Sequence, residues 1–412
     1  MSLQIKPILV ALRRHKAGTL LIALQIALTL AIVCNALFII HQRLANLSQR
    51  SGVDEADVFV ITNQWAVDKS TQQIDAQVQA DMAALRQLPS VRDAAPASGY
   101  PLAGVGSDNF VTLTPDQVKP TTDSAVYVGD EHLLDTLGLR LIAGRNFRSD
   151  EVLMTSTQQA VFPPVVIVSK TLADRLFPGG SALGKSFYAM SATPTTIIGI
   201  VDSLHRQGTS QWNKPYAGQS LIWPGRPDDS RGIYYIVRAR PGQLASAMRA
   251  APKALFAQDR MRIIDPKDGL LDYAQIRHRA YDSDRGMAIL MGIISAVLLA
   301  ITAAGIVGLT SFWVGQRRKQ IGVRRALGAT RNNILHYFLT ENLLIGLAGV
   351  IVGAVLAIGI NLWMVTRFEM DRMSLLYVGV GILALLLLGQ GAVFAPALRA
   401  SRVSPVEATR SV

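Results

Sequence analysis

The stretch PGGSALGKSF, residues 178–187, contains the residues of this chain whose spacing most resembles a chemical site. Gly179, Gly184, Lys185 and Ser186 follow the pattern G-x-x-x-x-G-K-S, which in nucleotide-binding proteins forms a loop around phosphates. Such a loop follows a buried strand and begins a helix, whereas here a short helix is predicted before the motif and a strand after it. We therefore interpret the motif as a Gly-rich turn and expect this chain to bind no cofactor.

Other residues that could do chemistry are few or far apart in the sequence. The single cysteine, Cys34, can form neither an internal disulfide nor a cysteine-based metal site, and we expect it to fill space in an apolar helix. His132 and His205 are not part of the His-x-x-x-His or Glu-x-x-His spacings that are typical of zinc sites. Because the chain also lacks a Gly-x-Ser-x-Gly sequence, we predict no catalytic residues, no metal and no enzyme activity on it.

Long apolar stretches must position whatever site the chain has. Each of the four is free of charged residues and exceeds the roughly 20 residues that cross a bilayer as a helix. A cleaved signal peptide would be shorter, and buried helices of a soluble core seldom stay apolar on all sides over such lengths. We therefore predict four transmembrane helices at 17–40, 287–314, 343–365 and 373–398.

The charges beside these stretches predict an orientation in the membrane. Three segments, 1–16, 315–342 and 399–412, together carry +11 of the net charge of +12. Because Lys and Arg mark the cytoplasmic side, we place these segments and both termini in the cytoplasm. Residues 41–286, which are close to neutral, and the short loop 366–372 then lie on the other side. This basic character is an orientation signal, so we expect no nucleic-acid partner.

Residues 41–286 predict a large α+β domain. Two β-α-β patterns, at 56–98 and 232–265, flank an insertion at about 100–230, which predicts a split βαβ layer with helices on one face. The insertion predicts a β-rich subdomain with short helices at 131–137 and 169–177. The flanking residues 42–51 and 267–286 predict helices that extend the first two spans as a stalk. Loose linkers are the alternative.

The segment 315–342 between the second and third spans is basic and amphipathic. Two interpretations remain open from the residues alone: a helix at the membrane surface whose Arg residues meet lipid phosphates, or a short helix that faces the cytosol and bends at glycine. If the segment is one helix, its apolar face consists of Val323, Ala326, Leu327, Ile334, Tyr337 and Phe338, opposite Arg318, Arg325 and His336.

RRKQIGVRRALGATRNNIL, residues 317–335, is similar to the signature of the MacB/FtsX-type ABC transporter permease family. Segments within 138–202 resemble that family's macrolide-exporter-like periplasmic core domain, and PALRASRVSPVEATR at 396–410 resembles its C-terminal tail. The resemblance implies a short cytoplasmic helix that docks on an ATPase and transmits force. The residues that it assigns to this coupling segment are Gln320, Ile321, Gly322, Val323, Arg324, Arg325, Ala326, Leu327, Gly328 and Ala329.

The resemblance further implies a permease subunit of an export complex in the cell inner membrane, with the large domain in the periplasm. We expect cytoplasmic ATPase subunits that bind ATP and Mg²⁺ on a separate chain, because only 16 residues precede the first span. Expected partners also include a second permease (homodimer or paralogous heterodimer), membrane lipids, and a periplasmic membrane-fusion adaptor with an outer-membrane channel. An FtsX-like regulator that activates a periplasmic hydrolase or senses a ligand is the alternative function. Gln320 departs from the acid usual in the family.

Three glycines in the third span permit close approach of another helix backbone. Gly346, Gly349 and Gly353 are spaced to lie along one side of that helix. We predict that they contribute to contact with a second subunit. Packing within the chain is the alternative.

Overall fold

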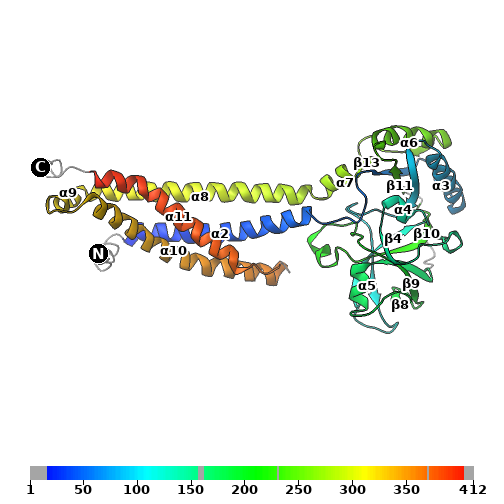
Figure 1. Cartoon of the computed structure of the whole chain (residues 1–412), viewed down its shortest axis with the longest axis horizontal. Helices are drawn as coiled ribbons and strands as arrows, with labels where there is room; N and C mark the ends of the chain where they lie inside the picture. The colour runs from blue at the N-terminus through cyan, green and yellow to red at the C-terminus, as the bar shows by residue number, and fades with distance from the viewer. Residues whose placement is uncertain (1–15, 156–161, 230–231, 369–370, 403–412) are drawn as a thin grey trace. The chain divides into compact units, whose positions relative to one another are not determined.

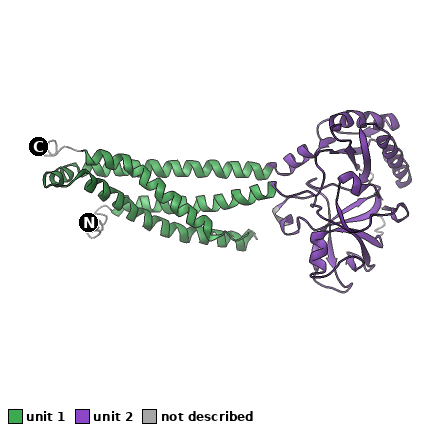
Figure 2. Cartoon of the chain, in the orientation of Figure 1, with its two compact units in different colours: residues 1–47, 283–412 green, residues 48–282 purple. Residues whose placement is uncertain are grey.

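The chain forms two compact units, residues 1–47 with 283–412 and residues 48–282 (Figure 2). The computed structural model describes residues 16–155, 162–229, 232–368 and 371–402. Most of the predicted cytoplasmic N-terminal segment, and the C-terminal tail from residue 403, therefore lie outside the described residues.

The first unit is a bundle of long helices. Each is long and apolar enough to cross a membrane, which agrees with the four predicted spans. A short helix, α9 (Arg318–Ala326), lies between the second and third of them. The long helices are α2 (Lys16–Leu47), α8 (Asp282–Gln316), α10 (Arg331–Phe368) and α11 (Leu375–Ser401) (Figure 1).

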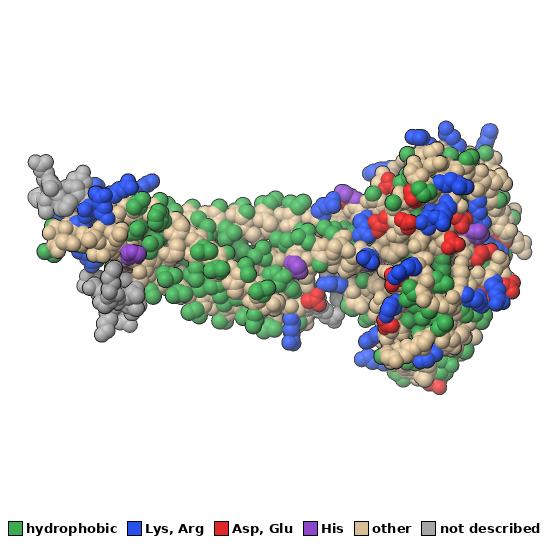
Figure 3. All heavy atoms as spheres, in the orientation of Figure 1, with side chains coloured by type: hydrophobic (Ala, Val, Ile, Leu, Met, Phe, Trp, Pro, Cys, Tyr) green, Lys and Arg blue, Asp and Glu red, His purple; other side chains and the backbone are tan. Residues whose placement is uncertain are grey.

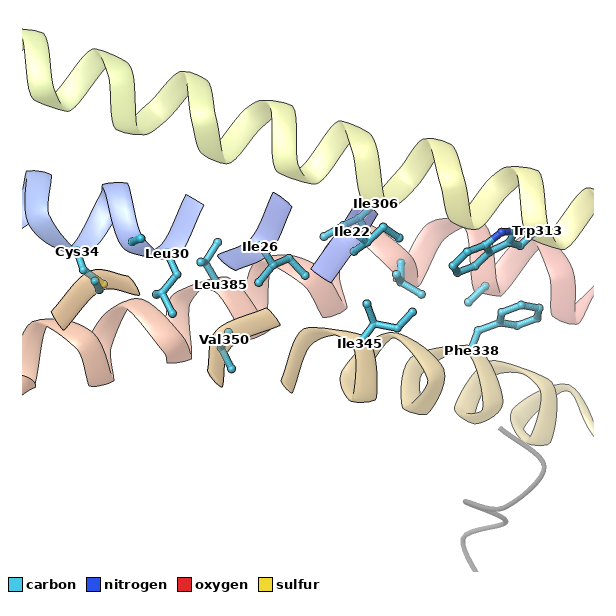
Figure 4. Packing of buried hydrophobic residues seen from close by; sticks show 14 of the residues in the cluster. Ile22, Ile26, Leu30, Cys34, Ile306, Trp313, Phe338, Ile345, Val350 and Leu385 are labelled. Carbon is cyan, nitrogen blue, oxygen red and sulfur yellow. The ribbon is translucent and has the colours of Figure 1, made fainter. Parts of the chain in front are cut away.

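The bundle core forms where one face of α2 meets α10 and α11. Ile22, Ile26 and Leu30 recur every four residues on α2 and are buried (Figure 4). They belong to one apolar cluster with Val350 of α10 and Leu385 of α11. Residues four apart lie on one helix face, so this spacing gives α2 a continuous apolar seam.

The three glycines of α10 face neighbouring helices of the same chain. A Cβ atom on Gly353 would lie 2.8 Å from the carbonyl oxygen of Ala27, and one on Gly349 would lie 2.9 Å from that of Ala23. A Cβ atom on Gly346 would meet a leucine side chain of α11 at 3.1 Å. These close approaches occur within the chain, as the alternative expects. Whether the glycines also contribute to contact with a second subunit stays a prediction.

One half of the second unit is the predicted split βαβ layer. Its strands run in the order β12-β1-β11-β2 with antiparallel neighbours, so each β-α-β pair encloses a strand of the other. The two helices and three of the strands share one buried apolar cluster, which places both helices on the same face. The elements are β1 (Val58–Trp65), α3 (Thr71–Arg86), β2 (Val91–Ala97), β11 (Ile233–Ala239), α6 (Leu244–Gln258) and β12 (Arg262–Ile263).

A buried ion pair fixes α3 to the short edge strand β12. The Arg262 guanidinium donates to Asp81 at 2.8 Å, and both side chains are fully buried. Tyr235 donates to the same carboxylate at 2.7 Å, and Arg262 also donates to Asn63 at 2.8 Å. These hydrogen bonds satisfy the carboxylate from two strands, which a buried charge requires.

The insertion forms the predicted β-rich subdomain, and its strand pairings close on themselves. Six strands pair in the cycle β4-β3-β8-β9-β7-β10 and back to β4, around a buried core that includes Val168, Phe187, Ile197 and Leu221. The elements of the subdomain are β3 (Ser107–Thr112), β4 (Thr122–Gly129), α4 (Leu133–Leu137), β5 (Leu141–Gly144), η1 (Ser149–Glu151), β6 (Leu153–Thr155), β7 (Val165–Ser169), α5 (Lys170–Leu176), β8 (Ser186–Ala189), β9 (Thr195–Val201), η2 (Gln211–Tyr216) and β10 (Ser220–Pro227).

The predicted helices beside this unit are only partly correct. Residues 48–51 are not helical, although α2 does continue to Leu47. Within 267–286, a strand, β13 (Leu270–Asp272), pairs with β1 and is followed by α7 (Tyr273–Ala280). Strand pairing to β1 therefore overrides the helical pattern of the sequence there.

Helix α6 of the split βαβ layer begins three residues after Pro241, because Gly242 adopts a φ of +74° that a helix does not allow.

Candidate functional site

Helix α9 ends sharply, and this ending defines the shape of the segment between α8 and α10. The φ of Gly328 is +98°, and the amide of Ala329 donates to the carbonyl of Arg324 at 3.0 Å. Helix α10 begins afresh, with the hydroxyl of Thr330 accepting from the amide of Asn333 at 3.2 Å. Of the two interpretations that the residues left open, the structure has the short helix that bends at glycine. The single apolar face across 323–338, which required one continuous helix, does not form, because a left-handed glycine interrupts the helix.

One side of α9 is buried in the bundle. Ile321 is 5% exposed and belongs to the apolar cluster of the long helices, and Gly322 beside it is also buried. Helix α9 also contacts α11. A buried apolar anchor and a contact to a long helix fix the position of α9 against the bundle.

The other side of α9 presents an apolar surface without cover from the described residues. Val323 is 51% exposed, Leu327 is 83% exposed, and Ala326 between them is also exposed. We name these three residues the α9 tip. Figure 3 shows Lys and Arg side chains gathered at the end of the unit that carries α9, and exposed members of the segment include Gln320, Lys319 and Arg324. Exposed large apolar groups among cations are typical of a contact surface.

An ion pair that the sequence analysis missed holds the base of this segment. One guanidinium nitrogen of Arg317 lies 3.0 Å from each carboxylate oxygen of Glu341. The side chains are 11% and 4% exposed, and Arg317 also stacks 5.9 Å from the ring centroid of Trp313. The bond joins the end of α8 to α10, while Arg324 lies 5.1 Å from the ring of Tyr337. Glu341 is the single acid in the predicted segment 315–342, but the sequence does not say which of the six cations there it contacts.

The secondary-structure elements beside the Gly-rich turn come in the opposite order to those beside a phosphate-binding loop. Helix α5 precedes it and strand β8 follows it, with Gly179 and Gly184 at φ values of +76° and +78°. The ammonium of Lys185 lies 4.7 Å from the ring centroid of Phe177, and the hydroxyl of Ser186 lies 3.0 Å from that of Thr196. These side chains make contacts inside the subdomain. That no nucleotide binds there remains a prediction.

The two histidines of the second unit lie in different surroundings. The Nδ1 of His132 lies 3.0 Å from an Asp93 carboxylate oxygen, and this hydrogen bond raises the pKa of His132. His205 is buried between the carbonyl of Arg206 and the side chain of Gln49, and burial lowers its pKa. Across the part of the chain that the structure describes, no three His, Cys, Asp or Glu side chains are grouped as metal ligands.

Fold and site together define a class: a membrane protein with four long apolar helices and a two-part α+β domain inserted between the first two. The family model "MacB-like periplasmic core domain" matches residues 19–255, more than half of the chain, and "FtsX-like permease C-terminal" matches 292–405. The chain therefore belongs to the MacB/FtsX-type permease family.

Relatives of this chain carry names from the same family. It is 26% identical to an uncharacterized ABC transporter permease, YvrN, of Bacillus subtilis over 69% of each chain. It is 25% identical, over 97% of its own length, to a macrolide export ATP-binding/permease protein MacB of Paracoccus denitrificans, of which it spans 57%. A solved periplasmic region of MacB from Actinobacillus actinomycetemcomitans matches 57% of this chain at 15% identity and a TM-score of 0.35.

Proposed function

We propose that this chain is the transmembrane subunit of an ABC-type export complex and that the α9 tip binds a cytoplasmic ATPase. The single observation that carries the proposal is the form of α9: one side anchored in the bundle at Ile321, the other side open at Val323 and Leu327. Buried apolar anchors surrounded by polar groups supply most of the energy at protein interfaces. The name of the Paracoccus denitrificans relative, which joins permease to ATP-binding functions, supports the same partner.

The base of the segment supplies a route for movement. Because Arg317 and Glu341 connect α8 to α10 beside α9, displacement of α9 reaches both long helices. In this proposal ATP and Mg²⁺ act on the partner, and their cycle moves the bundle and, through α2 and α8, the large domain. In this proposal α9 lies in the cytoplasm and the large domain in the periplasm, an orientation that the basic flanks support. The match to a MacB-like core over 19–255 favours export over the FtsX-like regulator.

The proposal is tested by placing a charge on the α9 tip. Leu327→Asp should lower recovery of an ATP-hydrolysing polypeptide with the affinity-tagged chain at least about tenfold, because a buried interface anchor costs about 2 kcal/mol or more when lost. Ala326→Trp should have the same effect by steric exclusion. The measurement is co-purification from gently solubilised membranes, followed by assay of ATP hydrolysis in the purified sample.

A matched control places the same charge three residues away. Thr330 is exposed and caps α10, and Asp is equally suited to a cap position, so Thr330→Asp should leave recovery unchanged. All variants should remain in the membrane fraction. Full recovery of the hydrolysing polypeptide with Leu327→Asp would instead assign the α9 tip to lipid.

A further inference from the structure

Most of the buried residues of helix α8 are polar. Its buried residues are Asp284, Ser295, Thr302 and Thr310 together with two apolar residues, Ile306 and Trp313, whereas most of its other large apolar residues are exposed. Within a membrane, apolar side chains gain no hydrophobic energy by leaving lipid for another helix. The polar contacts of α8 therefore carry unusual weight in fixing its position against α2.

Two of these contacts lie inside the predicted spans. The hydroxyls of Thr29 and Thr302 lie 2.8 Å apart, both buried. The amide of Gln25 donates to the carbonyl of Ile301 at 3.1 Å, one turn along α2. These contacts set the register of α2 against α8 but carry no net charge.

A charged cluster joins the same helices beyond the predicted spans, beside the ends that connect to residues 48–282. The guanidinium of Arg43 donates to the carboxylate of Asp284, and the amide of Asn46 donates to its other oxygen at 3.1 Å. The side chain of Asp284 is only 8% exposed. One residue earlier on α2, Gln42 donates to Asp371, in the segment between α10 and α11, at 2.9 Å. We name Arg43, Asn46 and Asp284 the clasp.

We infer that the clasp is a positioning site that makes α2 and α8 move as one body. The reason is that a nearly buried carboxylate is stable only while its cation and its amide donor stay in place. Relative sliding of the two helices would break both hydrogen bonds to Asp284 at once. This inference rests on the proposed function, in which α9 moves α8 and the connected pair carries that movement to the large domain.

The first arm of the test needs no partner. Hydrogen exchange of the full chain in lipid nanodiscs should show at least about tenfold faster exchange at 42–47 and 283–289 in Arg43→Ala than in the unmodified chain. Arg285→Ala, which removes an exposed cation next to the clasp, should show no change. Arg43→Asp combined with Asp284→Arg should restore protection, and Asp284→Asn, which keeps neutral hydrogen bonds, should lie between.

The second arm uses the complex and ATP. Arg43→Ala should recover as much of the hydrolysing polypeptide as the unmodified chain, because the α9 tip is intact, but its coupled hydrolysis should fall severalfold and return with the charge exchange. Equal hydrogen-exchange rates at 42–47 and 283–289 in Arg43→Ala and Arg285→Ala would overturn the inferred role of the clasp. If the unmodified chain recovers no hydrolysing polypeptide, the proposed function fails, while the exchange arm still decides the clasp.

Discussion

At the scale of single residues, buried charges lie where elements distant in the sequence meet. Glu341 accepts from Arg317 between α8 and α10, and Asp81 accepts from Arg262 between α3 and β12. Breaking such a pair leaves a charge without compensation, which costs about 3–5 kcal/mol. These pairs fix the geometry of the elements more than they add to stability, because apolar residues of similar size often stabilise a fold equally well.

A third cluster joins the two halves of the large domain and titrates in an accessible range. Arg86, at the end of α3, donates to Asp93 of β2 and to Asp130, which follows β4. His132 bonds the same Asp93, and its own amide donates to Asp130 at 3.1 Å. Burial raises the pKa of Asp130 to about 6. The charge of Glu131 adds to this rise, whereas Arg86 and His132 oppose it.

The signs of these shifts predict a loss of stability with rising pH. Because the folded pKa of Asp130 exceeds the unfolded value, the folded state binds more protons than the unfolded state between about pH 4 and 6. As the pH rises across that range, the free energy of unfolding falls by about 2–3 kcal/mol. The raised pKa of His132 adds stability that is present below about pH 6.5 and is lost as the pH rises through its folded pKa. This cluster should therefore raise the midpoint of thermal unfolding, followed by Trp fluorescence, at pH 5 relative to pH 8, while buried His205, whose pKa is lowered, acts in the opposite direction.

Two variants separate these contributions. Asp130→Asn should flatten the profile between pH 4 and 6, and His132→Gln should flatten the part above pH 6.5. Should Asp130→Asn keep the slope of the unmodified chain, the buried carboxyl is not the titrating group and this reading of the cluster is incorrect.

At the scale of elements, α10 packs against α2 through glycines. Gly353→Leu should lower the unfolding midpoint in detergent, because its Cβ would lie 2.8 Å from backbone that cannot withdraw, and overpacking costs about 1–3 kcal/mol. Gly359→Leu is the matched control on the same helix, since no atom lies within 4 Å of its Cβ position. A Gly353→Leu chain that unfolds normally but loses self-association would support the subunit-contact interpretation.

The sequence predicted elements well where one signal dominated. Uninterrupted apolar runs gave all four long helices, and alternation with turn residues gave both β-α-β units. It failed where contacts between distant residues decided the outcome. Residues 270–272 pair with β1 although their surroundings read as helix, and the closed cycle of six strands depends on pairings that no local pattern encodes.

The candidate site shows the same limit. Gly328 indicated a bend, so the break after α9 was within reach of sequence reasoning. The Arg317–Glu341 pair and the clasp could not be predicted, because each joins residues on different helices, 24 and 241 positions apart. Amphipathic periodicity reports one helix face at a time, and it cannot say which charges of two helices come together.

At the scale of the whole molecule, the chain consists of two compact units joined by two chain segments. Residues 1–47 with 283–412 form one compact unit and residues 48–282 form the other, and the chain passes between them only through the ends of α2 and α8. In the proposed function, movement that begins at α9 reaches the large domain through these two helices. The central claim is that such movement starts with an ATPase bound at the α9 tip.

Site-specific photo-cross-linking in intact membranes tests that claim most directly. A photoreactive residue at position 327 should form a covalent product with a polypeptide that azido-ATP also labels, whereas the same residue at 359, on an open face of α10, should react with lipid. Reaction of position 327 with lipid alone, and with no ATP-labelled polypeptide, would contradict the account.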